Sequence, residues 1–163
     1  LFVLGIFAWA LVNFGSIYAG CAQRAFDLAV KSAVKKTSVA HDGKTMTHNP
    51  MVQHIVADMA ITLESITPQL ERVASDWSTG VNHGGLWPSK IIAAKYNAVE
   101  GAKRVLNLAL DVMGGSGAFK GGEFERLYRD VMMGGIHPAN NQLTHEVVGK
   151  THLGVLGMQP RWG

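Results

Sequence analysis

The stretch WPSKIIAAKYNAVEGAKRVLNLALDVM, residues 87–113, decides the fold class of this chain. Large apolar residues recur at intervals of three, four and seven along one face: Ile92, Val99, Leu106, Leu110 and Met113. A second face carries mostly small residues at three- and four-residue spacing: Ala94, Ala98, Ala102, Val105 and Ala109. A helix that is apolar on two faces packs against neighbours on both sides. The stretch therefore predicts a long central helix, opened by Trp87-Pro88-Ser89.

Two further long helices are predicted before it. A row of small and apolar residues at helical spacing predicts a first helix that ends near Lys36: Ile17, Cys21, Ala25, Ala29 and Ala33. After a loop over residues 37–48, Asn49-Pro50 is a typical cap and first-turn pair. It opens a second stripe that continues to Trp77: Val52, Ile55, Met59, Leu63, Ile66, Leu70 and Val73. We expect Pro68 to kink or split this second helix.

The C-terminal third predicts shorter elements. The glycines of Gly114-Gly-Ser-Gly117 end the central helix, and Gly134-Gly135 ends a short helix built around Phe124 and Val131. We expect Pro138 to open a last helix that reaches about Leu153. No alternating strand pattern occurs in the sequence. The fold class predicted for the single domain 1–163 is all-α, an antiparallel four-helix bundle with short extra C-terminal helices.

Composition excludes several classes of protein. Hydrophobic residues make up 47% of the chain and charged residues 17%, which is typical of an ordered globular domain. The net charge of +3 is scattered, so we expect no nucleic-acid partner. Cys21 is the only cysteine, which excludes an intrachain disulfide and favours a cytoplasmic location. His145 and His152 are seven residues apart rather than four, so no metal site is predicted.

The uncharged run from Leu1 to Gln23 is long enough to span a membrane. Asn13, Ser16 and several small residues dilute it, and no basic residue precedes it as in a signal peptide. We therefore expect no membrane insertion.

The motif Gly114-Gly-Ser-Gly117 has two readings when it is taken alone. It could cradle a phosphate, because bare backbone comes close to an anion. It follows a helix rather than a strand, however, and lacks the Gly-Lys-Ser/Thr of a P-loop, so a plain helix terminator is the more common role. The residues by themselves lead to a helical bundle and no further.

Three stretches, in their order and spacing, resemble the C-terminal helical domain of acyl-CoA dehydrogenases. They are Gly20-Cys-Ala-Gln-Arg-Ala-Phe-Asp27, Ala57-Asp58-Met59, and the glycine turn followed by Phe124-Glu-Arg-Leu-Tyr-Arg-Asp130. The resemblance extends from about Phe7 to Leu153. It implies a bundle that pairs with copies of itself in a homodimer or homotetramer. It also implies FAD as the cofactor, an acyl-CoA as the substrate and electron-transfer flavoprotein as a possible partner.

The resemblance also implies cofactor-binding residues. In that family the glycine turn of one subunit approaches the adenosine diphosphate half of FAD bound to a neighbour, and here Gly114, Gly115 and Gly117 occupy the turn. An Arg and a Phe after the first helix usually contact the same region, and their positions correspond here to Lys36 and Val39. At the start of the last helix, Asn140 and Gln142 occupy positions that can contact flavin.

The catalytic base is where this chain departs from the family. The usual glutamate position holds Pro138, and a second family position for the base holds Ala10. Neither residue can accept a proton. His137 is the titratable candidate beside the lost glutamate, with a structural role as a helix cap as its alternative. Three functions follow as hypotheses: an acyl-CoA dehydrogenase, a reduced-flavin monooxygenase of the same fold, and a non-catalytic assembly module.

Overall fold

The computed structural model describes residues 2–39 and 42–157, and this part of the chain contains no β-strand. Five α-helices follow one another: α1 (Phe2–Lys35), α2 (Pro50–Ser78), α3 (Trp87–Met113), α4 (Glu123–Met132) and α5 (Asn141–His152). Short 3₁₀ turns join them, among them η4 (Gly114–Ala118) and η5 (Met133–Gly135). The predicted all-α class is confirmed, and the bounds of the central helix are those expected from its sequence.

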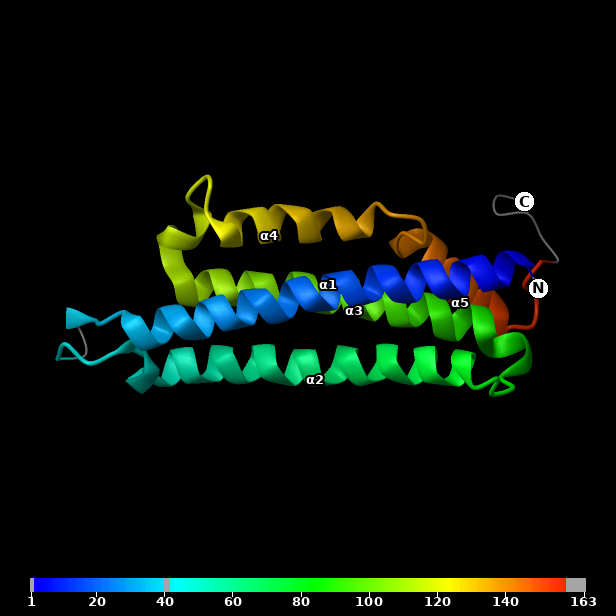
Figure 1. The fold of residues 1–163 in the computed structure, drawn as a ribbon, viewed down its shortest axis with the longest axis horizontal. Helices are drawn as coiled ribbons and strands as arrows, with labels where there is room; N and C mark the ends of the chain where they lie inside the picture. The colour runs from blue at the N-terminus through cyan, green and yellow to red at the C-terminus, as the bar shows by residue number, and fades with distance from the viewer. Residues whose placement is uncertain (1, 40–41, 158–163) are drawn as a thin grey trace.

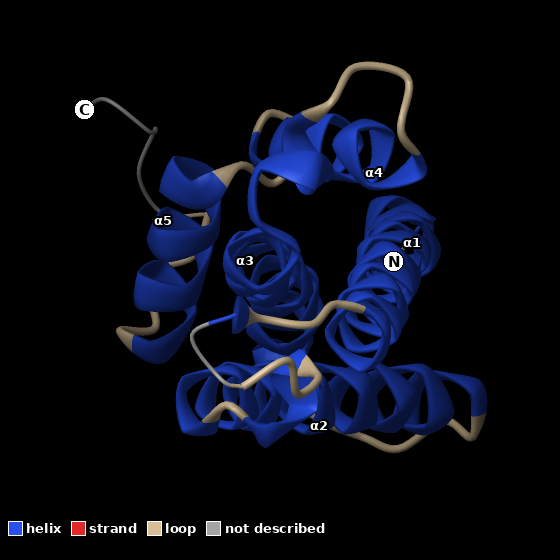
Figure 2. Ribbon diagram, turned by 90° about the vertical axis from the view of Figure 1, so that its left-hand side faces the viewer, coloured by secondary structure: helices blue, strands red, loops and turns tan. Residues whose placement is uncertain are grey.

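The first four helices alternate in direction, as Figure 1 shows. Seen end-on, α1 and α3 lie side by side, α2 crosses beneath both and α4 covers them on the opposite side (Figure 2). The short helix α5 lies beside α3, away from α1 (Figure 2). The antiparallel bundle is therefore confirmed, with the 10-residue α4 in the fourth position and α5 as the extra C-terminal helix.

Helix α3 is central, as expected, because its two apolar faces are buried against α1, α2 and α5. Two glycines allow the close approach of the helices. A Cβ at Gly15 on α1 would fall 2.6 Å from Leu70 Cδ2, and one at Gly101 on α3 would fall 2.8 Å from Ile66 Cγ2. A larger side chain at either position would force Leu70 or Ile66 to move.

Helix α2 begins as its sequence predicts, since the Asn49 side chain accepts a hydrogen bond from Met51 N at 2.9 Å. The expected split at Pro68 is wrong, because α2 continues through it to Ser78. Pro68 lies on the exposed side of the helix, whereas Ile66 and Leu70 on either side of it are buried. Packing of this buried face outweighs the hydrogen bond that proline cannot donate.

The last helix does not begin at Pro138, so that expectation is wrong as well. Helix α5 begins at Asn141, and the preceding Asn140 is its cap, with Oδ1 accepting from Leu143 N at 2.9 Å. Ala139 has a φ of +63°, a left-handed conformation that no helix continues through. Pro138 therefore lies in an exposed turn ahead of the helix, and Asn140 rather than His137 caps it.

The segment Leu4–Lys35 of α1 is long and apolar enough to cross a membrane by length and composition alone, a test that core helices of soluble proteins also pass. In this structure one face of the segment is buried in the bundle, through residues such as Leu11, Ala22 and Ala25. The expectation of no membrane insertion stays a prediction.

Candidate functional site

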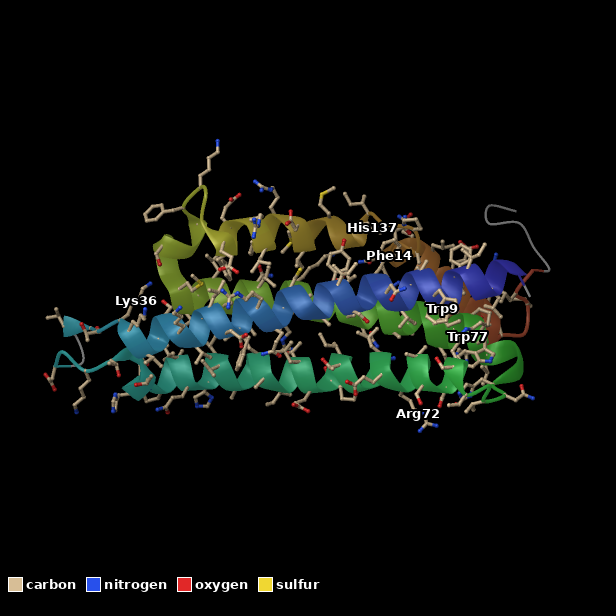
Figure 3. All side chains as sticks on the ribbon, in the orientation of Figure 1. Trp9, Phe14, Lys36, Arg72, Trp77 and His137 are labelled. Carbon is tan, nitrogen blue, oxygen red and sulfur yellow. The ribbon has the colours of Figure 1, made fainter. Side chains whose placement is uncertain are left out.

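The candidate residues form two groups, which lie at different places along the bundle. Lys36 lies at one end, where α1 finishes and the glycine turn follows α3 (Figures 1 and 3). His137 lies against Phe14, well along α1 toward the other end (Figure 3). Phe14 lies on α1, 22 residues before Lys36 at the end of that helix, which corresponds to roughly 33 Å along the helix. Residues so far apart on one chain cannot contact the same reacting atoms.

The three glycines of the turn differ in their surroundings. Gly114 ends α3 with a φ of +61°, a conformation that favours glycine, and donates its N–H to Leu110 O. Apart from the adjacent residues of the chain, no atom lies within 4 Å of a Cβ built on Gly114 or on Gly115, so the backbone of both faces open space. A Cβ on Gly117 would instead fall 2.9 Å from Leu110 Cδ1 and 3.3 Å from Phe124 Cδ1. Gly114 and Gly115 can thus accept a close ligand, whereas Gly117 is needed for packing.

Lys36 is brought to the same turn, as the resemblance implies. Its ammonium donates to Met113 O, at the last residue of α3, and to Ser116 Oγ at 2.9 Å. A cation at this place compensates the partial negative charge of the helix C-terminus. The turn therefore combines exposed backbone with a fixed positive charge. Val39, in contrast, is almost completely exposed, so it does not pack against the turn.

His137 lies in a cradle of aromatic rings on α1. Its ring centroid is 4.9 Å from that of Phe14 and 5.9 Å from that of Tyr18. Burial raises the pKa of the Tyr18 hydroxyl, and the charges of Cys21 and Asp130 raise it further. Tyr18 therefore remains a neutral phenol at physiological pH. His137, which is half-buried, is the basic side chain next to these two rings.

The other predicted positions lie in the loop after His137, in the first turn of α5 and on α1. Asn140 uses its side-chain oxygen as the cap of α5, whereas Gln142 is exposed in the first turn of that helix. Pro138 is exposed next to His137, and Ala10 is half-buried on α1. Gln142 thus remains available for a ligand, while the Asn140 oxygen is already occupied.

An apolar cavity of 390 Å³ lies along α1 next to the cradle. Leu4, Phe7 and Leu11 line it from α1, and Phe14 and Tyr18 continue the same helical row toward His137. Its remaining walls come from the start of α3, the turn before α5, α5 itself and the residues after it: Pro88, Ile91, Ile92, Ala139, Leu143, Val147 and Leu156. Because every lining residue is apolar, the cavity suits a hydrocarbon group rather than a charged one.

The sequence analysis missed Lys95, which is 1% exposed in the middle of α3. Its Nζ donates to Gly134 O at 3.0 Å and to Ala139 O at 3.1 Å, so it holds the segment that carries His137. Burial lowers the pKa of the Lys95 ammonium, Lys103 lowers it further and Glu100 opposes this shift. The sequence does contain a signal of burial for Lys95, because this residue lies at four-residue spacing between the apolar residues Ile91 and Val99.

A second charged cluster, also missed, joins α2 to the connection before α3. The Asp76 carboxylate accepts from Arg72 Nε and is bonded to His83 Nε2, both at 2.7 Å. These hydrogen bonds, from His83 first and then from Arg72, lower the pKa of Asp76. The His83 ring also packs on Trp87, with centroids 4.8 Å apart. The cluster lies near Trp77 and Arg72 in Figure 3, away from the glycine turn, and has the features of a structural clamp.

Metal ligands do not gather in the described residues, where no group of three or more His, Cys, Asp or Glu could hold an ion. His145 packs on Tyr96 at 5.2 Å, and His152 is bonded to Ser89 at 3.3 Å. Glu125 and Arg129 form an i, i+4 ion pair at 2.9 Å on α4.

Comparison with known proteins gives consistent results. Residues 3–151 match the family model described as acyl-CoA dehydrogenase, C-terminal domain. Cyclohex-1-ene-1-carbonyl-CoA dehydrogenase of Geobacter metallireducens is 34% identical over 82% of this chain and 34% of its own length. Acryloyl-CoA reductase (NADH) of Anaerotignum propionicum is 30% identical over 85% of this chain and 33% of its own length.

Butyryl-CoA dehydrogenase from Megasphaera elsdenii has the same fold, with a TM-score of 0.83 and 21% identity over 92% of this chain and 37% of its own. The chain thus spans about a third of the length of the relatives that it matches. The family match covers all five helices down to the last turn of α5. We conclude that the chain belongs to the acyl-CoA dehydrogenase family and corresponds to its C-terminal helical domain.

Proposed function

We propose that this chain completes the FAD site and mediates the self-association of a flavoenzyme that removes two hydrogens from an acyl-CoA. The observation that carries the proposal is the pair of half-sites on one bundle. One is a turn of bare backbone beside a fixed cation, and the other is a histidine beside an apolar cavity. The proposed location is cytoplasmic.

The glycine turn fits the diphosphate of FAD. Open space over Gly114 and Gly115 lets an anion approach the backbone, and the Lys36 ammonium adds favourable charge. Gln142, exposed on α5, is available for the flavin end. When bound, FAD would accept a hydride from the β-carbon of the acyl group.

The second half-site fits the acyl group and the proton that leaves it. The apolar cavity can hold a hydrocarbon chain or ring, and His137 lies next along the same face of α1. The imidazole would take the α-proton, in place of the glutamate that Pro138 replaces. The base then lies close to the cavity, whose lining includes Leu11, one turn before Phe14, and Ala139, two residues after His137.

The separation of roughly 33 Å between the half-sites supports a shared active site. If the glycine turn of one copy meets the flavin bound next to His137 of another, both half-sites are used in a homodimer or homotetramer. Exposed apolar side chains on α1, such as Trp9 and Ile17, provide surface for such contacts.

A second candidate function is a reduced-flavin monooxygenase of the same fold, which the replacement of the usual glutamate by Pro138 favours. There His137 would assist oxygen transfer to a small aromatic substrate. A third candidate function is non-catalytic: the bundle would serve only in assembly.

The electron acceptor that supports turnover distinguishes the three candidate functions. With the full-length protein we expect oxidation of an acyl-CoA, such as a six-carbon cyclic or straight-chain thioester, with electron-transfer flavoprotein or a dye as acceptor. Turnover only with O₂ and supplied reduced flavin would instead assign the monooxygenase. Flavin binding without turnover in either assay would leave the assembly role.

The role of His137 is tested in the same assay. His137→Ala is expected to lower turnover on the order of a hundredfold, the lower end for loss of a positioned acid–base group. Flavin content and thermal stability should change little, because the ring is partly exposed. A His145→Ala variant is the matched control. Full activity of His137→Ala would make that residue structural.

A further inference from the structure

The segment from Gly134 to Asn140, which carries His137, is held in a strained conformation. Ala139 has a φ of +63°, and an L-residue in this region costs about 1 kcal/mol or more. Such a conformation persists only where the surrounding structure enforces it. The contacts of this segment therefore show what fixes the position of His137.

Lys95 binds the segment at both ends. Its ammonium donates to Gly134 O at 3.0 Å and to Ala139 O at 3.1 Å, three residues before His137 and two residues after it. Thr144 Oγ1 adds a third bond, to Ala139 O at 3.2 Å. A single buried lysine side chain thus bonds to both ends of the turn that carries the imidazole.

The segment rests directly on the helices beneath it. A Cβ on Gly134 would fall 2.8 Å from Val99 Cγ1 and 3.0 Å from Tyr18 Cζ. When Lys95 draws the Gly134 carbonyl onto α3, it also fixes the distance of the turn from Tyr18. The position of the imidazole beside Phe14 and Tyr18 depends on how the segment packs on these helices.

Within residues 2–39 and 42–157, Lys95 forms no ion pair. Glu100, the nearby acid of α3, bonds to Lys103 at 2.8 Å and to Asn141 at 3.2 Å. Burying a charge without a counterion costs several kcal/mol. Folding alone is therefore a poor explanation for a lysine here.

We propose that Lys95 is a positioning residue, which holds both ends of the 134–139 segment so that the His137 imidazole stays aligned for proton transfer. This rests on the proposed function of His137. Lys95 does not touch the substrate, and its effect passes through the loop.

Two measurements on the full-length flavoenzyme test this. In Lys95→Met, amide hydrogen exchange in the segment 134–140 should become at least tenfold faster, while α2 exchanges as in the wild type. Turnover should fall on the order of tenfold with unchanged flavin content and KM, since the imidazole is present but misaligned. Lys90→Met is the control on the same helix, about 140° around it from Lys95.

A double-mutant cycle then separates positioning from general damage. If Lys95 acts through His137, Lys95→Met in the background of His137→Ala should cause no further loss of turnover. Losses that multiply would overturn the proposal, as would unchanged exchange in Lys95→Met. If that variant does not fold, Lys95→Gln, which keeps an N–H donor on a shorter chain, replaces it in both measurements.

Failure of the proposed catalytic role of His137 can be distinguished from failure of the proposed role of Lys95. Full turnover in His137→Ala would reject the catalytic role of His137, and with it the positioning role of Lys95. Reduced turnover in His137→Ala with a fully active, slowly exchanging Lys95→Met would reject only Lys95.

Discussion

At the scale of single residues, the glycine turn shows one residue type in three roles. Gly114 supplies a positive φ, Gly115 leaves the backbone open, and Gly117 makes room for Leu110 and Phe124. The motif does not distinguish these roles, because each depends on what the folded chain places around the missing Cβ.

Gly117→Ala should therefore destabilise the domain by about 1 kcal/mol, since the added methyl group must displace Leu110 in a packed site. Gly115→Ala should change stability by less than about 0.5 kcal/mol. Urea unfolding of the two variants provides the comparison. Equal stabilities would show that the turn is loosely packed at both positions.

Asp76 gives the domain a predictable response to acid. Its pKa is lowered in the folded state, so its contribution to stability is present above the unfolded-state pKa of about 3.9 and is lost as the pH falls through the folded-state value. Between pH 7 and pH 3, wild type should lose more stability than Asp76→Asn. The control is Asp111→Asn, a change at an exposed acid of α3. Parallel pH profiles for wild type and Asp76→Asn would contradict the clamp.

At the scale of elements, helix ends were predictable where a local signal sets them. Asn49 caps α2 through its own side chain, and Gly114 ends α3 through its own φ, so both follow from short-range chemistry. The expected split of α2 at Pro68 and the expected start of the last helix at Pro138 are wrong for the opposite reason. Packing of α2 on its buried face overrides the first, and the competing cap of Asn140 overrides the second.

Pro68→Ala should stabilise the domain, by about 1 to 3 kcal/mol. The position is exposed within a continuous helix, and alanine restores the missing backbone donor without entering the core. Thermal or urea unfolding measures the gain. A loss of stability would mean that α2 is shaped around the proline ring and that the substitution disturbs its packing.

At the scale of the whole molecule, the exposed apolar surface bears on assembly. Trp9 is 64% exposed and Ile17 58%, both on α1, whose other face is buried in the bundle. Such side chains are typical of surfaces that another protein covers. We expect a dimer or tetramer by light scattering of the full-length protein. A monomer at high concentration would contradict the shared site.

The resemblance predicts most residues of the candidate site. It does not predict that these residues form two separate half-sites. The resemblance already implies that Lys36 lies near the glycine turn, but only the folded chain shows that His137 lies roughly 33 Å away from both. Lys95 was missed because a lysine in a helix usually extends to solvent. Its partners are loop carbonyls, which have no signature in sequence.

The flavin content of the full-length protein tests the central claim most directly. Gly115→Leu places a bulky side chain in the open space at the glycine turn, and Gly85→Leu does the same at an equally open position before α3. If the turn receives FAD, only Gly115→Leu should lose visible flavin absorbance per subunit, and both variants should unfold at the wild-type temperature. Flavin content equal to wild type in Gly115→Leu would contradict the assignment.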